Sequence, residues 1–171
     1  MRFWIAQFFG LCGLGFMVYG LFSKNKDRML RCVILNGLSF SIEYLLLSAY
    51  SGMGSNLFGV VRTYICLKKE SDPRLNQKMV LLAIMMVYLV IGIFSFDGWI
   101  SILPILAEEI YVVSLWQTRV QSIRLGTAAM VILWLIYDLV VAAFPSAVCD
   151  LIVLISSILS IFVKKNINDE P

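Results

Sequence analysis

The feature that most constrains this sequence is a series of seven long apolar segments separated by short polar stretches. Only 15% of its 171 residues are charged, and its mean hydropathy is +0.88, whereas about 25% of the residues in a soluble domain are charged. In water such a chain would expose more apolar surface than a folded monomer tolerates. The composition therefore excludes a soluble enzyme, a nucleic-acid-binding domain and a sizeable extramembrane domain. It predicts an all-α integral membrane protein.

Each apolar segment approaches the ~20 residues that a helix needs to cross a bilayer, so the pattern predicts seven transmembrane helices. The predicted helices are Phe3–Phe22, Met29–Ala49, Met53–Leu67, Met79–Phe96, Trp99–Gln117, Arg124–Phe144 and Ser146–Val163. The first has no small-residue cleavage site after it and is expected to be a retained helix. Glycines and serines in Tyr50–Ser55 predict a tight turn before the third helix, and Phe144-Pro145-Ser146 predicts one before the seventh.

Basic residues predict the orientation of these helices. Of the 14 Lys and Arg residues, all except Arg2 and Arg62 follow the first, third, fifth or seventh segment. The positive-inside rule then places the N-terminus outside and the C-terminus in the cytoplasm. A six-helix arrangement would put basic clusters on opposite sides of the membrane, so seven helices are favoured.

The chain also contains an internal repeat, in which similar features return after 93 to 94 positions. The paired positions are Gly10 with Pro104, Arg31 with Arg124, Tyr44 with Tyr137, Tyr50 with Phe144, and Asn56 with Asp150. Gly10 and Pro104 are each expected to interrupt the first helix of their triplet. We interpret residues 1–171 as a single transmembrane domain with a triple-helix repeat at 3–67, a linker helix at 79–96 and a second repeat at 99–163. The odd linker makes the triplets parallel, so their binding groups are expected to meet near the midplane.

Two stretches resemble the YgjV-like family of bacterial inner-membrane proteins: Tyr50-Ser-Gly-Met-Gly-Ser-Asn-Leu-Phe-Gly-Val-Val-Arg62-Thr and Leu133-Trp-Leu-Ile-Tyr-Asp-Leu-Val. The resemblance implies a multi-pass protein of the inner membrane. The three-one-three layout is also similar to that of SWEET, PQ-loop and PnuC transporters, although no Pro-Gln dipeptide occurs. In SWEETs two asparagines on the third and seventh helices contact the substrate. Asn56 fits the first position, whereas Asp150 departs from the second.

Six charged residues lie within the apolar segments, and each costs ~2.5–3.5 kcal/mol to insert near the bilayer centre. They are Glu43, Arg62, Glu108, Glu109, Asp138 and Asp150. Five acids against one arginine are too negative for an anion path. We therefore expect that cations or protons neutralise this interior, or that several of the acids are protonated.

Glu108 is the first candidate for a substrate or ion site. It lies mid-segment on one polar stripe with Ser101, Pro104 and Tyr111, and Pro104 is expected to interrupt the helix and free a carbonyl. Glu109 points about 100° away and is expected to face a neighbouring helix. Asn56 and Asp150 are predicted to approach Glu108 across the pseudo-two-fold axis.

Each of the other candidates has a structural alternative. Arg62 either pairs with a buried acid or extends to the membrane surface. Asp150 either contacts substrate or caps the first turn of its helix. Glu43 and Asp138 are further site candidates or make structural hydrogen bonds. The glycines Gly10, Gly13 and Gly20 are interpreted as close-packing surfaces between helices.

These features predict a small-solute transporter of SWEET-like architecture, with proton coupling through Glu108 as one form. The expected partners are the lipid bilayer, a small polar or cationic solute or protons, and further copies of the chain. The alternative is a non-transporting scaffold or subunit whose acids pair with a partner chain. Histidine and the motifs Gly-x-Ser-x-Gly and His-Glu-x-x-His are absent, so we expect no enzyme, no catalytic residue, no cofactor and no metal site.

Overall fold

The computed structural model describes residues 1–21, 26–68, 72–117 and 119–168, and these residues form α-helices and no strands. The α-helices are α1 (Arg2–Leu21), α2 (Lys26–Leu46), α3 (Tyr50–Lys68), α4 (Lys78–Phe94), α5 (Ile102–Leu115), α6 (Val120–Val141) and α7 (Phe144–Asn168). Two 3-10 helices, η1 (Pro73–Asn76) and η2 (Trp99–Ser101), precede α4 and α5. The described residues therefore confirm the all-α class and give one α-helix for each predicted segment.

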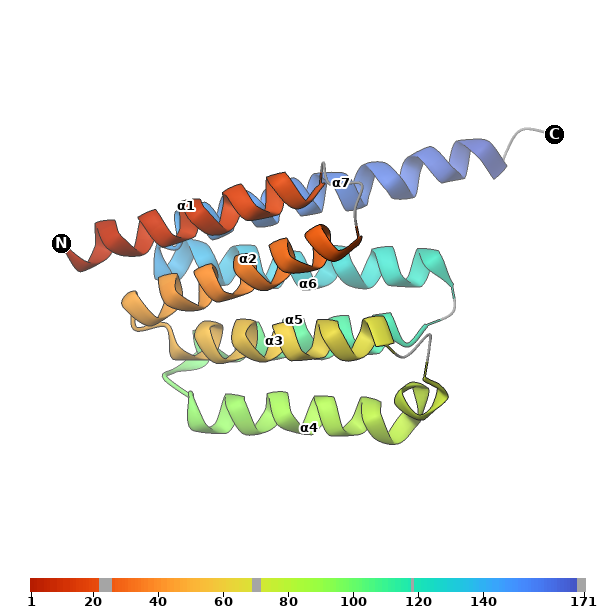
Figure 1. The fold of residues 1–171 in the computed structure, drawn as a ribbon, viewed down its shortest axis with the longest axis horizontal. Coiled ribbons are helices and arrows are strands. Elements are labelled where there is room, and N and C mark those ends of the chain that lie inside the picture. The colour runs from red at the N-terminus through yellow and green to blue at the C-terminus, as the bar shows by residue number, and fades with distance from the viewer. Residues whose placement is uncertain (22–25, 69–71, 118, 169–171) are drawn as a thin grey trace.

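The helices lie side by side with their axes along one common direction (Figure 1). α1 begins at one end of the bundle, and the C-terminal ends of α1, α3, α5 and α7 lie at the other (Figure 1). We call the first end, which holds the α2–α3, α4–α5 and α6–α7 connections, the turn end. Six helices form a closed ring in the order α1, α2, α3, α5, α6, α7, while α4 lies outside it against α3 and α5.

Small residues on α1 allow α2 to approach closely. A Cβ atom at Gly13 would lie 2.6 Å from Cε1 of Phe40, and one at Gly20 would lie 3.0 Å from Cβ of Cys32. At Gly10 the added atom would overlap the Glu43 carboxylate. Glycine removes these overlaps and brings the two backbones together, which confirms that Gly10, Gly13 and Gly20 are packing surfaces.

The prediction of a turn over Tyr50–Ser55 is wrong, because these residues are the first part of α3. The turn lies before them, where Ser48 has a φ of 61° and the amide of Ala49 donates to the Tyr44 carbonyl at 2.8 Å. The small residues of the segment serve packing instead. A Cβ atom at Gly52 would lie 2.7 Å from Cε1 of Tyr137.

The turn between α6 and α7 has the same design, and it lies before the predicted Phe144-Pro145-Ser146. Ala142 has a φ of 59°, and the amide of Ala143 donates to the Asp138 carbonyl at 2.9 Å. α7 then begins at Phe144, with Pro145 in its first turn, where a missing amide costs no helical hydrogen bond. Equivalent positions in the two turns are 94 residues apart, the separation of Tyr44 and Asp138.

Neither Gly10 nor Pro104 interrupts a helix, contrary to the sequence-based expectation. α1 is continuous through Gly10, and α5 begins only at Ile102, so Pro104 lies in its first turn. A proline there removes an amide that has no intrahelical acceptor in any case. Pro104 therefore frees no carbonyl beside Glu108.

Two stretches within the described residues, Arg2–Gly20 and Gln121–Val141, are long and apolar enough to cross a membrane by length and composition. Lys78–Phe94 and Phe144–Leu159 are apolar but shorter. The 14 residues of α5 span about 21 Å at ~1.5 Å per residue, less than the ~30 Å hydrocarbon core of a bilayer. The 3-10 turn η2 extends this helix toward the turn end.

Candidate functional site

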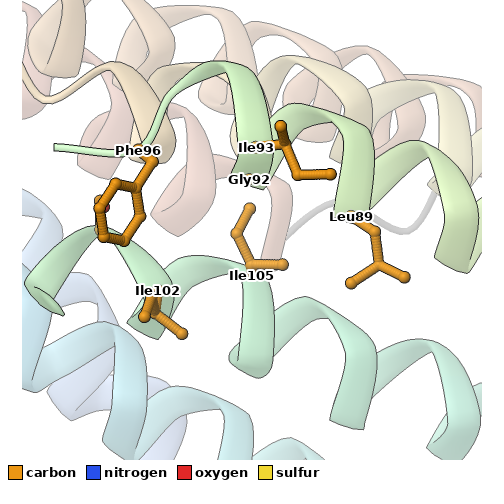
Figure 2. Close-up of a pocket in the computed structure, with 7 residues that line it drawn as sticks. Leu89, Gly92, Ile93, Phe96, Ile102 and Ile105 are labelled. Carbon is orange, nitrogen blue, oxygen red and sulfur yellow. The ribbon is translucent and has the colours of Figure 1, made fainter. Parts of the chain in front are cut away.

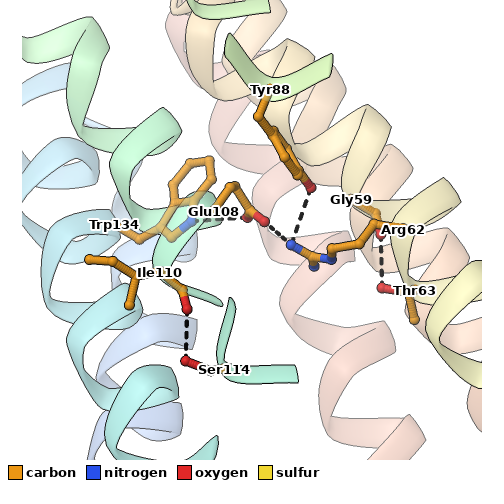
Figure 3. A network of polar contacts seen from close by, with 8 residues as sticks. All are labelled: Gly59, Arg62, Thr63, Tyr88, Glu108, Ile110, Ser114 and Trp134. Carbon is orange, nitrogen blue, oxygen red and sulfur yellow. Dashed lines mark hydrogen bonds and ion pairs between the residues drawn. The ribbon is translucent and has the colours of Figure 1, made fainter. Parts of the chain in front are cut away.

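Arg62 of α3 and Glu108 of α5 form an ion pair in the interior of the bundle (Figure 3). Only 7% of Arg62 and 5% of Glu108 are exposed. The pair exists because α3 and α5 are neighbours in the ring, and Arg62 and Glu108 lie at mid-height on the faces that these helices turn to each other. Arg62 therefore pairs with a buried acid, the first of the two alternatives that the sequence left open.

Aromatic side chains from three helices surround this ion pair, and two of them, Tyr88 and Trp134, are drawn in Figure 3. The Nη1 atom of Arg62 donates to the Tyr88 hydroxyl of α4 at 3.2 Å, and its guanidinium lies 4.7 Å from the centre of the Tyr111 ring. The indole Nε1 of Trp134 on α6 donates to Oε1 of Glu108 at 3.3 Å. Both charges are thus solvated by protein groups in place of water.

A small polar pocket of about 110 Å³ opens beside the pair between α2, α3 and α5. Its polar lining consists of Asn36, Asn56, Arg62, Thr63 and Glu108. Asn36 donates from Nδ2 to the Gly13 carbonyl at 2.9 Å, and Thr63 donates to the Gly59 carbonyl at 2.8 Å. At ~30 Å³ for each water, the pocket has room for three or four water molecules.

Three further acids gather at a second place, between α2, α6 and α7. Glu43 and Asp138 are fully buried. Oε2 of Glu43 accepts from the Ser146 hydroxyl at 2.6 Å, and Oδ1 of Asp138 accepts from the Tyr44 hydroxyl at 2.6 Å. Asp150 lies within electrostatic range of Asp138 and Tyr44. We call Glu43, Asp138 and Asp150 the acid cluster.

The bundle buries the ion pair and the acid cluster in its interior and exposes large apolar side chains on its exterior. This arrangement suits a protein surrounded by lipid. A family model described as "Bacterial inner membrane protein", Imp-YgjV, matches residues 4–166. The chain belongs to the Imp-YgjV family. Comparison with curated proteins and with solved structures gave no match. Membership of the Imp-YgjV family places the protein in the bacterial inner membrane, in contact with the lipid bilayer.

In this Imp-YgjV protein, the residues predicted to form one site lie at two places. Asn56 lines the same pocket as Glu108, whereas Asp150 does not line that pocket and belongs to the acid cluster. The structure also removes the capping role considered for Asp150. Because α7 begins at Phe144, Asp150 lies in the second turn of the helix, beyond the amides that a cap accepts from.

Glu109 lies on the face of α5 away from the pocket. It is half-buried, and neither of its carboxylate oxygens has a hydrogen-bond partner among the described residues. Its position agrees with the expectation that Glu109 turns away from Glu108. It forms no part of the network around Arg62 in the described residues.

Sequence reasoning missed Tyr88 and Trp134, which hold the two charges of the ion pair. The sequence predicts residues 79–96 only as a linker helix, without a polar contact to the bundle. Tyr88 is nevertheless fully buried and bonded to Arg62. The available signal was a single tyrosine hydroxyl in a helix of otherwise apolar residues, since such a hydroxyl in a membrane needs a partner.

An apolar pocket of about 450 Å³ lies between α4 and α5 (Figure 2), and its lining includes no residue of the ion pair or of the acid cluster. Leu89, Ile93, Phe96 and Ile105 supply most of its wall. Its one hydroxyl, on Ser101, is already used, because it donates to the Gly98 carbonyl at 2.6 Å. The pocket offers no polar group for specific recognition and fits the bilayer environment of this face.

Proposed function

We propose that this inner-membrane protein transports a small polar solute through the pocket at Arg62, Glu108 and Asn56. The observation that carries the proposal is a buried ion pair beside a polar pocket. The pocket leaves space beside the pair, and Nε of Arg62 has no hydrogen-bond partner among the described residues. The pocket thus combines a guanidinium, a carboxylate and amide groups with spare hydrogen-bonding capacity.

We further propose that the helices cross the membrane seven times as two triple-helix repeats joined by α4. Three observations support this arrangement. The two turns share their geometry at a separation of 94 residues. The contacts of the ring also pair off, because α1–α2, α2–α3 and α1–α7 correspond to α5–α6, α6–α7 and α3–α5. Finally, α4 lies outside the ring.

The proposed orientation has the turn end outside and the C-terminal end of α7 in the cytoplasm. In support, α1 begins at the opposite end of the bundle from the end of α7 (Figure 1), as an odd number of crossings requires. The basic residues Arg74, Lys78, Arg119 and Arg124 lie next to the helix ends opposite the turn end. The positive-inside rule favours this assignment.

Transport would require movement of the two triplets, because the pocket holds only a few waters. The Arg62–Glu108 contact joins α3 of the first triplet to α5 of the second. A solute with both hydrogen-bond donors and acceptors would bind by replacing part of this contact. Exchange of the pair for solute contacts then allows rocking of one triplet against the other, as alternating access in repeat transporters requires.

One observation favours the alternative, a subunit that assembles with another chain. Glu109 is half-buried as a residue, whereas the oxygens of its carboxylate are buried within this chain and have no hydrogen-bond partner among the described residues. A partner helix that brought a Lys or Arg to this position would satisfy it. Under this alternative Glu109, and not Glu108, is the functional acid.

The test is a solute screen followed by uptake into vesicles that contain the purified protein. A solute that binds the folded state raises the unfolding temperature. Small amino acids, polyols and amines are therefore screened by the rise in unfolding temperature that each produces. We expect a stabilising solute to be taken up by wild-type vesicles. Glu108→Gln should abolish both stabilisation and uptake, while Glu109→Gln retains both. Loss in Glu109→Gln alone, together with co-purification of another chain, would support the subunit instead.

A further inference from the structure

The acid cluster is a second charged assembly, and its chemistry differs from that of the ion pair. Glu108 has a counterion in Arg62. The groups that act electrostatically on Glu43, Asp138 and Asp150 are one another and neighbouring hydroxyls, and no basic side chain is among them in the described part of the chain. The cluster therefore concentrates negative charge without a protein cation to balance it.

Each acid of the cluster also keeps one oxygen unpartnered. Oε1 of Glu43, Oδ2 of Asp138 and Oδ2 of Asp150 are buried and have no hydrogen-bond partner among the described residues. The other oxygens of Glu43 and Asp138 accept from hydroxyl groups at 2.6 Å. A buried carboxylate oxygen without a donor is costly, so these oxygens point to a ligand that supplies positive charge.

This ligand is not expected to be a metal ion, because the described residues contain no group of three or more acidic, Cys or His side chains placed to hold one. A proton fits, since it needs only one carboxylate oxygen at a time. Carboxylates that lie within electrostatic range of one another in a buried site cannot all be ionised. We propose that the acid cluster is a proton-binding site, distinct from the solute pocket, and that it supplies the coupling proton for the proposed transport.

A water-accessible pocket at the turn end leads toward this cluster. It has a volume of about 420 Å³, and Ser51, Asp97 and Tyr137 contribute to its lining. The hydroxyl of Tyr137 lies 3.0 Å from Oγ of Ser51, and its ring packs 6.0 Å from that of Tyr44, centre to centre. Tyr44 in turn donates to Asp138. Tyr137 therefore lines the pocket at the turn end and also packs against the tyrosine that donates to Asp138, and under our proposal the coupling proton enters on this side of the cluster.

The groups that face the cluster come from each helix around it. α2 contributes Tyr44, α6 contributes Tyr137, and α7 contributes Cys149, which lies within electrostatic range of all three acids. α1 presents the backbone of Gly10 to Glu43 and carries no titratable group there. In the proton step, an O–H bond of a hydronium ion at the turn end breaks and an O–H bond forms on one carboxylate oxygen. A water molecule is left behind, and the negative charge of the cluster decreases by one.

The role in coupling rests on the proposed transport function, whereas proton binding itself does not. The experiment is therefore infrared difference spectroscopy of the full protein in lipid vesicles, between mildly acidic and mildly alkaline buffer. We expect a carbonyl stretching band of protonated carboxylic acids that decreases in alkaline buffer. Asp138→Asn and Glu43→Gln should each remove part of this band. Asp72→Asn, at an exposed acid next to η1, should leave it unchanged.

A conservative variant keeps the test independent of folding defects. Tyr44→Phe preserves the ring and removes the hydrogen bond to Asp138, so the Asp138 contribution should shift in frequency and remain in intensity. The proposal is overturned if wild type shows no such band, or if Asp138→Asn, Glu43→Gln and Tyr44→Phe all leave it unaltered. A normal band in a protein that takes up no solute would refute transport alone.

Discussion

Removing both halves of the Arg62–Glu108 ion pair is expected to destabilise the protein less than the two single removals together. Removal of one partner of a buried pair typically costs ~3–5 kcal/mol, because it leaves an uncompensated charge. Replacement of both partners by groups of similar volume is close to neutral. The set of variants is Arg62→Met, Glu108→Gln and their combination.

The contacts around the ion pair predict which of the two single variants loses more stability. In Glu108→Gln the guanidinium keeps the Tyr88 hydroxyl at 3.2 Å and the Tyr111 ring at 4.7 Å, so we expect a loss near the lower limit, ~3 kcal/mol. In Arg62→Met the carboxylate keeps only the Trp134 indole at 3.3 Å among the contacts described above. We expect a loss near ~5 kcal/mol there.

The double variant should lose the contacts of the guanidinium with the two tyrosines and little more. A hydrogen bond contributes ~0.5–1.5 kcal/mol and a cation–π contact ~0.5–2 kcal/mol, so the expected loss is ~1–3.5 kcal/mol, against ~8 kcal/mol for the sum of the single losses. The free energy of unfolding is measured by tryptophan fluorescence during titration with a denaturing detergent. Glu109→Gln, on the same helix, is the matched control. Additivity of Arg62→Met and Glu108→Gln within ~0.5 kcal/mol would refute the ion pair.

Two further predictions concern topology and packing. Alkaline phosphatase fused to the C-terminus should be inactive and a fluorescent protein there should fluoresce, because the proposed orientation places that end in the cytoplasm; phosphatase activity would contradict seven crossings. Gly52→Ala should destabilise the protein by ~1–3 kcal/mol, because its Cβ would lie 2.7 Å from Cε1 of Tyr137. Gly15→Ala meets no atom within 4 Å and should be neutral or stabilising by up to ~1 kcal/mol in the same unfolding titration.

Apolar length and local composition were sufficient to predict the helices but not their ends. Each predicted segment overlaps one α-helix, because burial of backbone groups in lipid permits few other structures. The error at Tyr50–Ser55 has a physical cause. Glycine and serine mark turns in water, but at a helix interface in a membrane they allow close approach, and Gly52 does so against Tyr137.

The sequence identified the buried charges but not which of them meet. Arg62 could pair with any of five acids in the apolar segments. Which of them it meets depends on which helices are neighbours in the ring, and the sequence does not give that order. The pairing of Asn56 with Asp150 followed from the repeat and placed both beside Glu108. Under the proposed repeat, α3 lies next to α5 and its equivalent, α7, lies next to α1. Asp150 is therefore on the opposite side of the ring from Asn56 and does not approach Glu108.

The acid cluster and the ion pair are related differently to the proposed repeat. Tyr44 and Asp138 are 94 residues apart and bonded to each other, so under the proposed repeat the acid cluster lies at the axis that relates the triplets. The ion pair has no such counterpart, because the positions equivalent to Arg62 and Glu108 are Ser156 and Leu14.

The polar pocket is therefore confined to the α3–α5 side of the ring, which is the side that α4 covers. There Tyr88 is fully buried and bonded to Arg62. A helix that only joined two repeats would need no such bond. Under the proposed repeat and transport function, α4 thus does more than connect the triplets: it completes the solvation of the guanidinium and distinguishes the side of the bundle that holds the solute pocket from the opposite side.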